Sequence, residues 1–222
     1  MLLPCRCRTT CYLVTALRAQ GCASKLGIVL NLSPVIPATD APADHAYARL
    51  MDGRLVRRYM VRCYYSRKVV SSCGHWDANT GGMPLTDMGW EIYPDGLTEL
   101  LLRLHRDYKL PLTFITENGA AFKDELSDGC IRDAQRTDFI ARHIIAVSNA
   151  LKKGVRIGGY MVWSLFDNFE WASGYEKRFG IAYVDYATQK RTLKDSALWY
   201  REFLKSRNMK ACDQEEVLAR NN

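Results

Sequence analysis

The sequence of 222 residues contains no apolar run that approaches the roughly 18 residues a membrane-spanning helix needs. The region after Met1 also lacks an apolar stretch of adequate length before a small-residue cleavage site, which argues against a secretory signal peptide. We therefore expect no membrane partner and a cytoplasmic location.

Motifs for cofactors and metals are missing as well. No GxGxxG or GxxxxGK[ST] loop occurs, which argues against a nucleotide cofactor. The 4 histidines show neither HxxxH nor HxH spacing, and the 8 cysteines include no CxxC pair. We expect no cofactor and no metal, and we interpret the cysteines as free thiols in a reducing compartment.

Positive charge is in excess, with a formal net charge of +7. Its densest stretch, residues 49–68, overlaps a helix-compatible segment and contains no RNA-binding motif. A basic run without such a motif is more typical of a solvated helix face than of a nucleic-acid groove. We therefore expect no nucleic-acid partner.

Hydrophobic residues make up 48% of the chain, which is typical of a globular protein. Their spacing predicts strands and helices in alternation. The predicted strands cover residues 27–32, 64–66, 110–117, 159–163 and 180–184, and the predicted helices cover residues 43–60, 94–108, 133–152 and 196–204. This order predicts an α/β fold in which helical crossovers join parallel strands.

A carboxylate stands where one of these strands opens into a loop. Glu117 lies in the pentapeptide Ile115–Gly119, which closes the apolar run that begins at Leu110. In barrels of alternating strands and helices, catalytic groups lie at the C-terminal ends of the strands. We therefore interpret Glu117 as a candidate catalytic residue.

Aromatic and acidic residues alternate after the next predicted strand, from Trp163 to Trp171. Sugar rings pack their C–H faces on indoles, and their paired hydroxyls suit a carboxylate, so the mixture fits a carbohydrate pocket. An aromatic core cluster capped by surface acids has the same composition. Composition alone leaves both interpretations open.

Several separated motifs resemble the C-terminal half of the family 1 glycoside hydrolases, the β-glucosidases. The resemblance runs from about Ala16 to Leu204 and keeps the order of the motifs. They are Gly89–Pro94, Thr116–Gly119, Trp163–Trp171, Lys177–Gly180 and Asp195–Ala197.

The resemblance implies that Glu117 is the nucleophile of a retaining O-glycosyl hydrolase and that Tyr65 orients its carboxylate. Retaining hydrolysis also needs a second carboxyl group as general acid and base. In the family this group is the Glu of an Asn-Glu-Pro motif, and no such triplet occurs in this sequence. The resemblance therefore implies impaired hydrolysis by the isolated chain.

The resemblance also assigns the sugar-binding residues. It implies that Trp163 is the platform beneath the sugar, that Glu170 binds two distal hydroxyls, and that Trp171 donates to a neighbouring hydroxyl. Phe179 would line the same pocket. Family members acting on 6-phosphorylated sugars carry a small hydroxyl residue where Glu170 stands, so the resemblance implies an unphosphorylated β-glucoside or related β-glycoside.

The implied fold is a partial (β/α)₈ TIM barrel, roughly its last four βα units. Residues 61–63 join two segments that a long helical stretch separates in the family, so the sixth strand is expected to be truncated. Cys63 replaces the usual Asn before Tyr64. Residues 1–15 match nothing, residues 16–206 form the barrel half, and residues 207–222 form a tail.

Three hypotheses remain open at this point. The first is β-glycoside hydrolysis of the retaining β-glucosidase type, impaired in this chain. The second is a non-catalytic protein that binds sugars, self-associates or pairs with another half-barrel through unpaired strand edges. The third is a fragment without function.

Overall fold

The computed structural model describes residues 16, 18–21, 35–37, 39–49, 68–70, 82–108 and 112–206. The strands predicted over residues 27–32 and 64–66 lie outside this part of the chain, and so does Tyr65. The unmatched segment 1–15 and the tail 207–222 lie outside it too.

Three long helices follow the predicted pattern: α3 (Pro94–Tyr108), α4 (Ala134–Lys152) and α5 (Asp195–Ser206). Residues 42–49 are also helical. Proline suits the first position of α3 because an N–H there would have no partner within the helix. Gly154, with φ of +92°, ends the turn after α4 and donates to the carbonyl of Leu151 at 2.9 Å. The predicted helices over 94–108, 133–152 and 196–204 are confirmed.

In the described part of the chain, two strand pairs are parallel. β3 (Thr113–Asn118) pairs with β6 (Ile157–Val162), and α4 lies between them in the sequence. The predicted helical crossover between parallel strands is confirmed for this pair. β1 (Val35–Pro37) pairs with β2 (Lys68–Val70), and neither of these strands was predicted.

Within the described residues, two antiparallel hairpins stand beside the parallel pairs. β4 (Leu126–Ser127) pairs with β5 (Cys130–Ile131), and β7 (Ala182–Val184) pairs with β8 (Arg191–Leu193). The first hairpin turns at Asp128 and Gly129, whose φ values of 52° and 75° fit a tight turn with both central residues left-handed. No strand was predicted over residues 126–131, and a two-residue turn joins antiparallel strands without a helical crossover.

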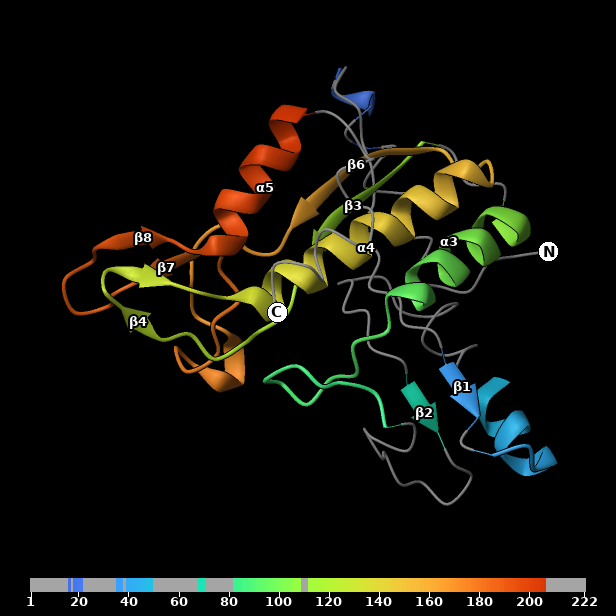
Figure 1. Ribbon diagram of the computed structural model, residues 1–222. Coiled ribbons are helices and arrows are strands. Elements are labelled where there is room, and N and C mark those ends of the chain that lie inside the picture. Colours follow the sequence, from blue (N-terminus) through green and yellow to red (C-terminus); the bar gives the residue numbers. More distant parts are fainter. Residues whose placement is uncertain are drawn as a thin grey trace.

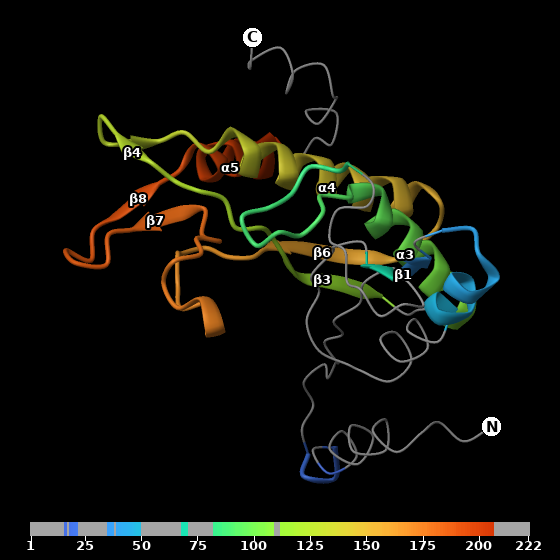
Figure 2. The ribbon, with the colours of Figure 1, turned by 90° about the horizontal axis from the view of Figure 1, so that it is seen from below.

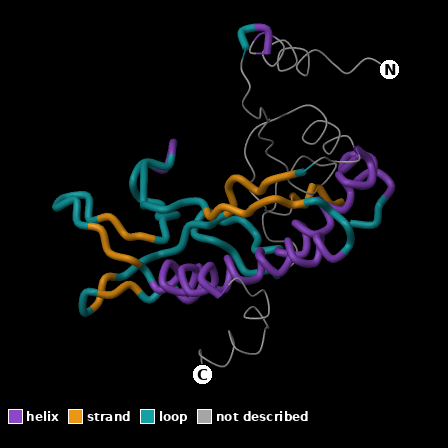
Figure 3. Tube along the Cα trace, turned by 90° about the horizontal axis from the view of Figure 1, so that it is seen from above, coloured by secondary structure: helices purple, strands orange, loops and turns teal. Residues whose placement is uncertain are grey.

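The helices cover one face of the β3–β6 pair. Figures 1 and 2 show α3 and α4 along one side of these strands, and Figure 3 shows the same separation of helices from strands. The core between them consists of Leu97, Leu101, Ile115, Ala146, Val147, Ala150 and Val155. The Thr98 hydroxyl ties α3 to α4 by donating to the Ala146 carbonyl at 2.9 Å. Helix α5 packs on α4 beside a second cluster that includes Phe139, Ile140 and Ala197.

The opposite face of the β3–β6 pair carries exposed apolar side chains. Leu112, Phe114 and Met161 are 48%, 49% and 45% exposed. Parallel sheets are ordinarily covered on both faces, so this face is unusual for its strand type. Within the described residues the strands form two-stranded sheets, and these sheets close no barrel.

One buried histidine belongs to the helical core. His143 on α4 is fully buried, and its ring stacks on Phe139 with centroids 3.9 Å apart. Its Nδ1 lies 2.7 Å from the Phe139 carbonyl, which can only accept, so Nδ1 carries the proton. Burial lowers the pKa of His143 from 6.5 to about 4.

Acid should therefore destabilise the fold through His143. Between pH 6.5 and about 4 the unfolded chain binds a proton that the folded chain does not. The contribution is fully present above pH 6.5 and is lost as the pH falls towards 4, by on the order of 3 kcal/mol. Urea unfolding of the native chain and of His143→Gln at several pH values should show a difference in stability that shrinks through this window. A constant difference would contradict the assignment.

Candidate active site

The C-terminal ends of β3 and β6 place two predicted site residues at the same edge. Asn118 is paired with Val162, and the Trp163 N–H donates to the Asn118 carbonyl at 2.9 Å. Glu117 precedes this contact on β3 and is half-buried, as is Trp163, which directly follows β6. The parallel register therefore brings the candidate carboxylate and the candidate aromatic platform to neighbouring strand ends.

A side-chain hydrogen bond holds the end of β3. Asn118 is buried, and its Oδ1 accepts from the Tyr160 hydroxyl at 2.6 Å. Burial raises the pKa of Tyr160 well above its ordinary value, so the hydroxyl stays protonated and remains a donor. This tyrosine was not among the predicted site residues, although its place on the predicted strand 159–163 puts it near the site.

The backbones of the two strand ends approach very closely at Gly119. A Cβ atom added there would lie 1.6 Å from the Trp163 carbonyl oxygen. Backbone cannot move aside as a flexible side chain can, so only glycine fits this position. The close approach of the two backbones therefore explains why the Thr-Glu-Asn-Gly motif has glycine at its last position, two residues after Glu117.

The segment after β6 forms a loop whose last residues, near Phe179, lie next to its first residue, Ser164. The Ser164 N–H donates to the Phe179 carbonyl at 3.2 Å, and the Ile181 N–H donates to the Ser164 carbonyl at 2.8 Å. The Trp163–Ser164 peptide is cis. These bonds fasten the base of a loop, residues 164–180, which we call the aromatic loop.

The aromatic loop carries Glu170 and Trp171 at its far end. Glu170 is buried, with 6% exposure, and its N–H donates to the Gly174 carbonyl at 2.7 Å. Trp171 begins a short 3₁₀ turn, Trp171–Ser173, and is 62% exposed. Its φ of +47° is a left-handed conformation that side-chain-bearing residues adopt at a cost of about 1–2 kcal/mol, so the surroundings must hold it.

Phe179 and Trp163 occupy contrasting surroundings. Phe179 is 1% exposed and its ring lies 6.0 Å from that of Trp90, so it packs into the core at the base of the aromatic loop. The Trp163 Nε1 atom is buried and makes no hydrogen bond within the described part of the chain. A buried donor without a partner calls for an explanation, and an acceptor brought by a ligand is one.

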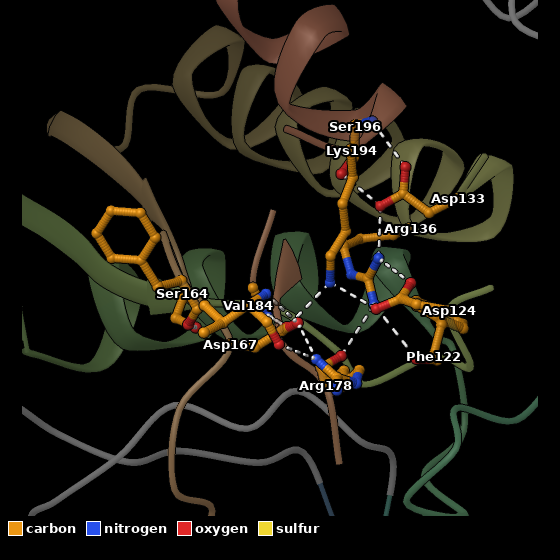
Figure 4. Close-up of polar contacts among 12 residues, drawn as sticks. Phe122, Asp124, Asp133, Arg136, Ser164, Asp167, Arg178, Val184, Lys194 and Ser196 are labelled. Atoms are coloured by element: carbon orange, nitrogen blue, oxygen red, sulfur yellow. Dashed lines mark hydrogen bonds and ion pairs between the residues drawn. The ribbon is translucent and has the colours of Figure 1, made fainter. Parts of the chain in front are cut away.

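Asp167 lies at the centre of a buried ionic network beneath this loop (Figure 4). Its carboxylate accepts from Arg178 at 2.7 Å and from Lys194 at 2.9 Å. It also accepts from the backbone N–H groups of Gly180 at 2.9 Å and Val184 at 3.3 Å. One carboxylate therefore binds the loop, the strand that follows it and the start of α5.

The network continues to the start of α4 (Figure 4). Lys194 bridges Asp167 to Asp124, and Asp124 in turn binds Arg136. Burial is the main cause that lowers the pKa of Lys194, while the two carboxylates act in the opposite direction. Sequence patterns did not predict this network, because its charged residues come from separate segments and look like ordinary surface charges.

Other predicted features lie elsewhere. Tyr65 is outside the described residues, so its place relative to Glu117 stays a prediction. Among the residues that the structure describes, no group of three His, Cys, Asp or Glu side chains is arranged to hold a metal ion. No helix of that part of the chain has the length and apolar character to span a membrane.

The sequence profile of glycosyl hydrolase family 1 matches residues 56–209. The chain belongs to glycosyl hydrolase family 1. This confirms the resemblance drawn from the motifs, and the candidate site lies inside the matched region.

Family 1 relatives include enzymes with different substrates in their names. β-Glucosidase A of Thermotoga maritima is 51% identical over 128 residues, which are 57% of this chain and 29% of that protein. A bifunctional β-D-glucosidase/β-D-fucosidase of Bifidobacterium breve is 49% identical over 127 residues, 54% of this chain and 27% of that protein. A 6-phospho-β-galactosidase of Leptotrichia buccalis is 43% identical over 138 residues, 62% of this chain and 29% of that protein.

Solved structures agree with the family assignment. The family 1 β-glucosidase of Thermotoga maritima matches with a TM-score of 0.77 and 34% identity, over 86% of this chain and 53% of that one. The β-glucosidase of Exiguobacterium antarcticum B7 matches with a TM-score of 0.78 and 35% identity, over 90% and 55%. The α/β fold of a TIM-barrel family is thereby confirmed, and the chain spans just over half the length of these structures.

The close approach at Gly119 predicts a severe effect of adding one methyl group. Gly119→Ala should destabilise the fold by about 3 kcal/mol, at the upper end of overpacking, because the Trp163 carbonyl leaves no room. Gly158→Ala is the matched control, since its Cβ would meet the ring of the half-exposed Phe114, which can move. Urea unfolding measures both, and equal losses would show that the strand ends are not so tightly joined.

Proposed function

We propose that this chain carries the nucleophile half of a retaining β-glycoside hydrolase. Glu117 attacks the anomeric carbon, the bond from that carbon to the leaving oxygen breaks, and a glycosyl-enzyme intermediate forms that water then hydrolyses. The observation that carries the proposal is the junction of β3 and β6, where Glu117 and Trp163 lie at paired strand ends. Membership of glycosyl hydrolase family 1 supports the reaction class.

The aromatic loop supplies the sugar-binding part of the proposal. Trp163 packs beneath the sugar ring, and its buried, unpartnered Nε1 is a donor available to a ligand oxygen. Glu170 accepts from two neighbouring hydroxyls, and the exposed Trp171 closes over the same end of the sugar. Phe179 supports this pocket from the core side, packed against Trp90.

Glu170 also determines the substrate class that we propose. The relatives include both β-glucosidases and 6-phospho-β-galactosidases, so similarity alone favours neither substrate. A carboxylate at this end of the pocket repels a phosphate group, since like charges at short range oppose binding. We therefore propose an unphosphorylated β-glucoside or a related β-glycoside.

The second carboxyl group of the reaction remains to be supplied. Retaining enzymes place an acid/base carboxyl about 5–5.5 Å from the nucleophile. The sequence contains no Asn-Glu-Pro triplet, so this chain offers no such group by motif. Without a positioned proton donor, its hydrolysis of unactivated glycosides should be about 10²–10⁴-fold slower than that of a complete site.

The exposed face of β3 and β6 favours a second role, association with another half-barrel. Leu112, just before β3, forms an apolar surface with Phe114 on β3 and Met161 on β6, whereas a parallel sheet is normally covered on both faces. In a closed barrel the inward side chains of neighbouring strands pack in layers. A half-barrel of the same family, or a second copy of this chain, could bury this face whether or not the chain catalyses hydrolysis.

A covalent label tests the nucleophile. With 2,4-dinitrophenyl 2-deoxy-2-fluoro-β-D-glucoside the leaving group departs as a phenolate and needs no proton donor, so the acid/base group is dispensable. Intact mass should show one fluoroglucosyl adduct, which peptide mapping assigns to Glu117. Glu117→Gln should abolish it because the amide is not a nucleophile.

The same reagent with a 6-phosphate is the control for substrate class and should label at least tenfold more slowly. An adduct on another residue would contradict the role of Glu117. Absence of an adduct, even after co-expression with the N-terminal half of a family 1 enzyme, would favour the association role or a fragment without function.

The apolar face predicts self-association. The purified chain should elute in size-exclusion chromatography with light scattering above its monomer mass of 25.3 kDa. Replacing Phe114 and Met161 by Thr introduces β-branched residues, which suit strands, and removes apolar area, so it should shift the chain towards the monomer. Leu204→Thr, on an exposed position of α5, is the control. A native chain that is a clean monomer at all concentrations would refute self-association through this face.

A further inference from the structure

The buried network beneath the aromatic loop contains equal numbers of opposite charges. Its members are Asp124, Asp133, Asp167, Arg136, Arg178 and Lys194. The side chains of all but Arg178 are at most 1% exposed, and Arg178 is 19% exposed. The charges of three carboxylates and three cations sum to zero, so the network is buried without net charge.

Asp167 makes its contacts on both sides of the loop that contains it. It lies between Trp163 and Glu170 in the sequence, yet its Oδ1 binds the Gly180 N–H at the loop's return. Its Oδ2 binds Arg178 and the Val184 N–H. The carboxylate therefore joins the outgoing and returning arms of the aromatic loop.

Lys194 ties this carboxylate to the helical layer. Its Nζ binds both Asp167 and Asp124, and Asp124 is bound by Arg136 in the first turn of α4. Asp133 completes the path by binding Arg136 and both the N–H and hydroxyl of Ser196 on α5. The loop is thus connected to the N-terminal turns of two helices.

Stability alone is a poor reason for this arrangement. Burying ions costs desolvation, and apolar residues of similar size are often as stabilising as a buried ion pair. What a fully hydrogen-bonded network provides is one defined geometry, since each donor and acceptor fits only one arrangement. The aromatic loop needs such support because Phe169 and Trp171 at its surface are 57% and 62% exposed.

We infer that Asp167 and Lys194 are a positioning pair for sugar binding, which holds Glu170 and Trp171 in the geometry that a glycoside requires. The inference rests on the proposed function for the identity of the ligand. The pair contacts no substrate itself, because protein donors occupy both oxygens of Asp167. Its effect reaches the sugar through the backbone of the aromatic loop.

A charge-balanced double variant tests the inference on the full chain. Asp167→Asn with Lys194→Met removes one charge of each sign. The network then keeps two carboxylates and two cations, so it stays neutral and the fold should survive. The inactivation kinetics with the fluoroglucoside above separate binding, as KI, from chemistry, as kinact. We expect KI to rise at least tenfold while kinact changes less than about threefold, because Glu117 on β3 lies outside the network.

Hydrogen exchange measured by mass spectrometry gives the second readout. Peptides covering residues 164–180 should exchange at least tenfold faster in the double variant, while those of α3 and β3 keep the native rate. Arg142→Ala is the matched control, since it removes the exposed pair between Arg142 and Asp138 on α4. It should leave KI and loop exchange unchanged.

The outcomes separate this inference from the proposed function. An unchanged KI, or loop exchange that is unchanged or accelerated equally throughout the chain, overturns the positioning role. If the native chain takes no label, the proposed function fails, and the exchange of residues 164–180 alone decides whether Asp167 and Lys194 hold the loop. A double variant that does not fold is replaced by Lys194→Arg, which keeps the charge and should alter KI and loop exchange in the same direction.

Discussion

The parallel pairing of β3 with β6 is the constraint on which the candidate site depends. It aligns the two C-terminal strand ends, so that Glu117 and Trp163 lie at one edge although they are 46 positions apart in the sequence. The two strand ends are tightly packed, because the Trp163 N–H donates to the Asn118 carbonyl and the Trp163 carbonyl lies against Gly119. A shift of one residue in β3 would turn Glu117 to the other face of the sheet.

The same pairing leaves the molecule with two unlike faces. Helices α3 and α4 bury Ile115 and the neighbouring apolar residues on one face, while Phe114 and Met161 remain exposed on the other. In the TIM-barrel relatives the inner face of each strand packs against the inner faces of other strands. This chain spans just over half the length of those structures, and in it Phe114 and Met161 are about half exposed.

Local sequence predicted the features that local chemistry determines. The periodic apolar residues and Gly154 predicted a helix over residues 133–152, and α4 begins one residue later, at Ala134. The apolar run before Glu117 predicted that this residue lies near the end of a strand. The Asp128-Gly129 turn was equally local, but a two-residue hairpin was not considered there. The network was beyond such reasoning, since Lys194 meets an aspartate 70 residues away and nothing in its neighbourhood marks it as buried.

The acidic residues of the aromatic loop show why the sequence pattern needed a structure to interpret it. Asp167 and Glu170 are three residues apart and both are buried, so composition assigns them the same role. The Asp167 oxygens are fully engaged by Arg178, Lys194 and two backbone N–H groups, which leaves no capacity for a sugar hydroxyl. Asp167 therefore supports the aromatic loop, whereas Glu170 is the acid that we propose for binding the sugar.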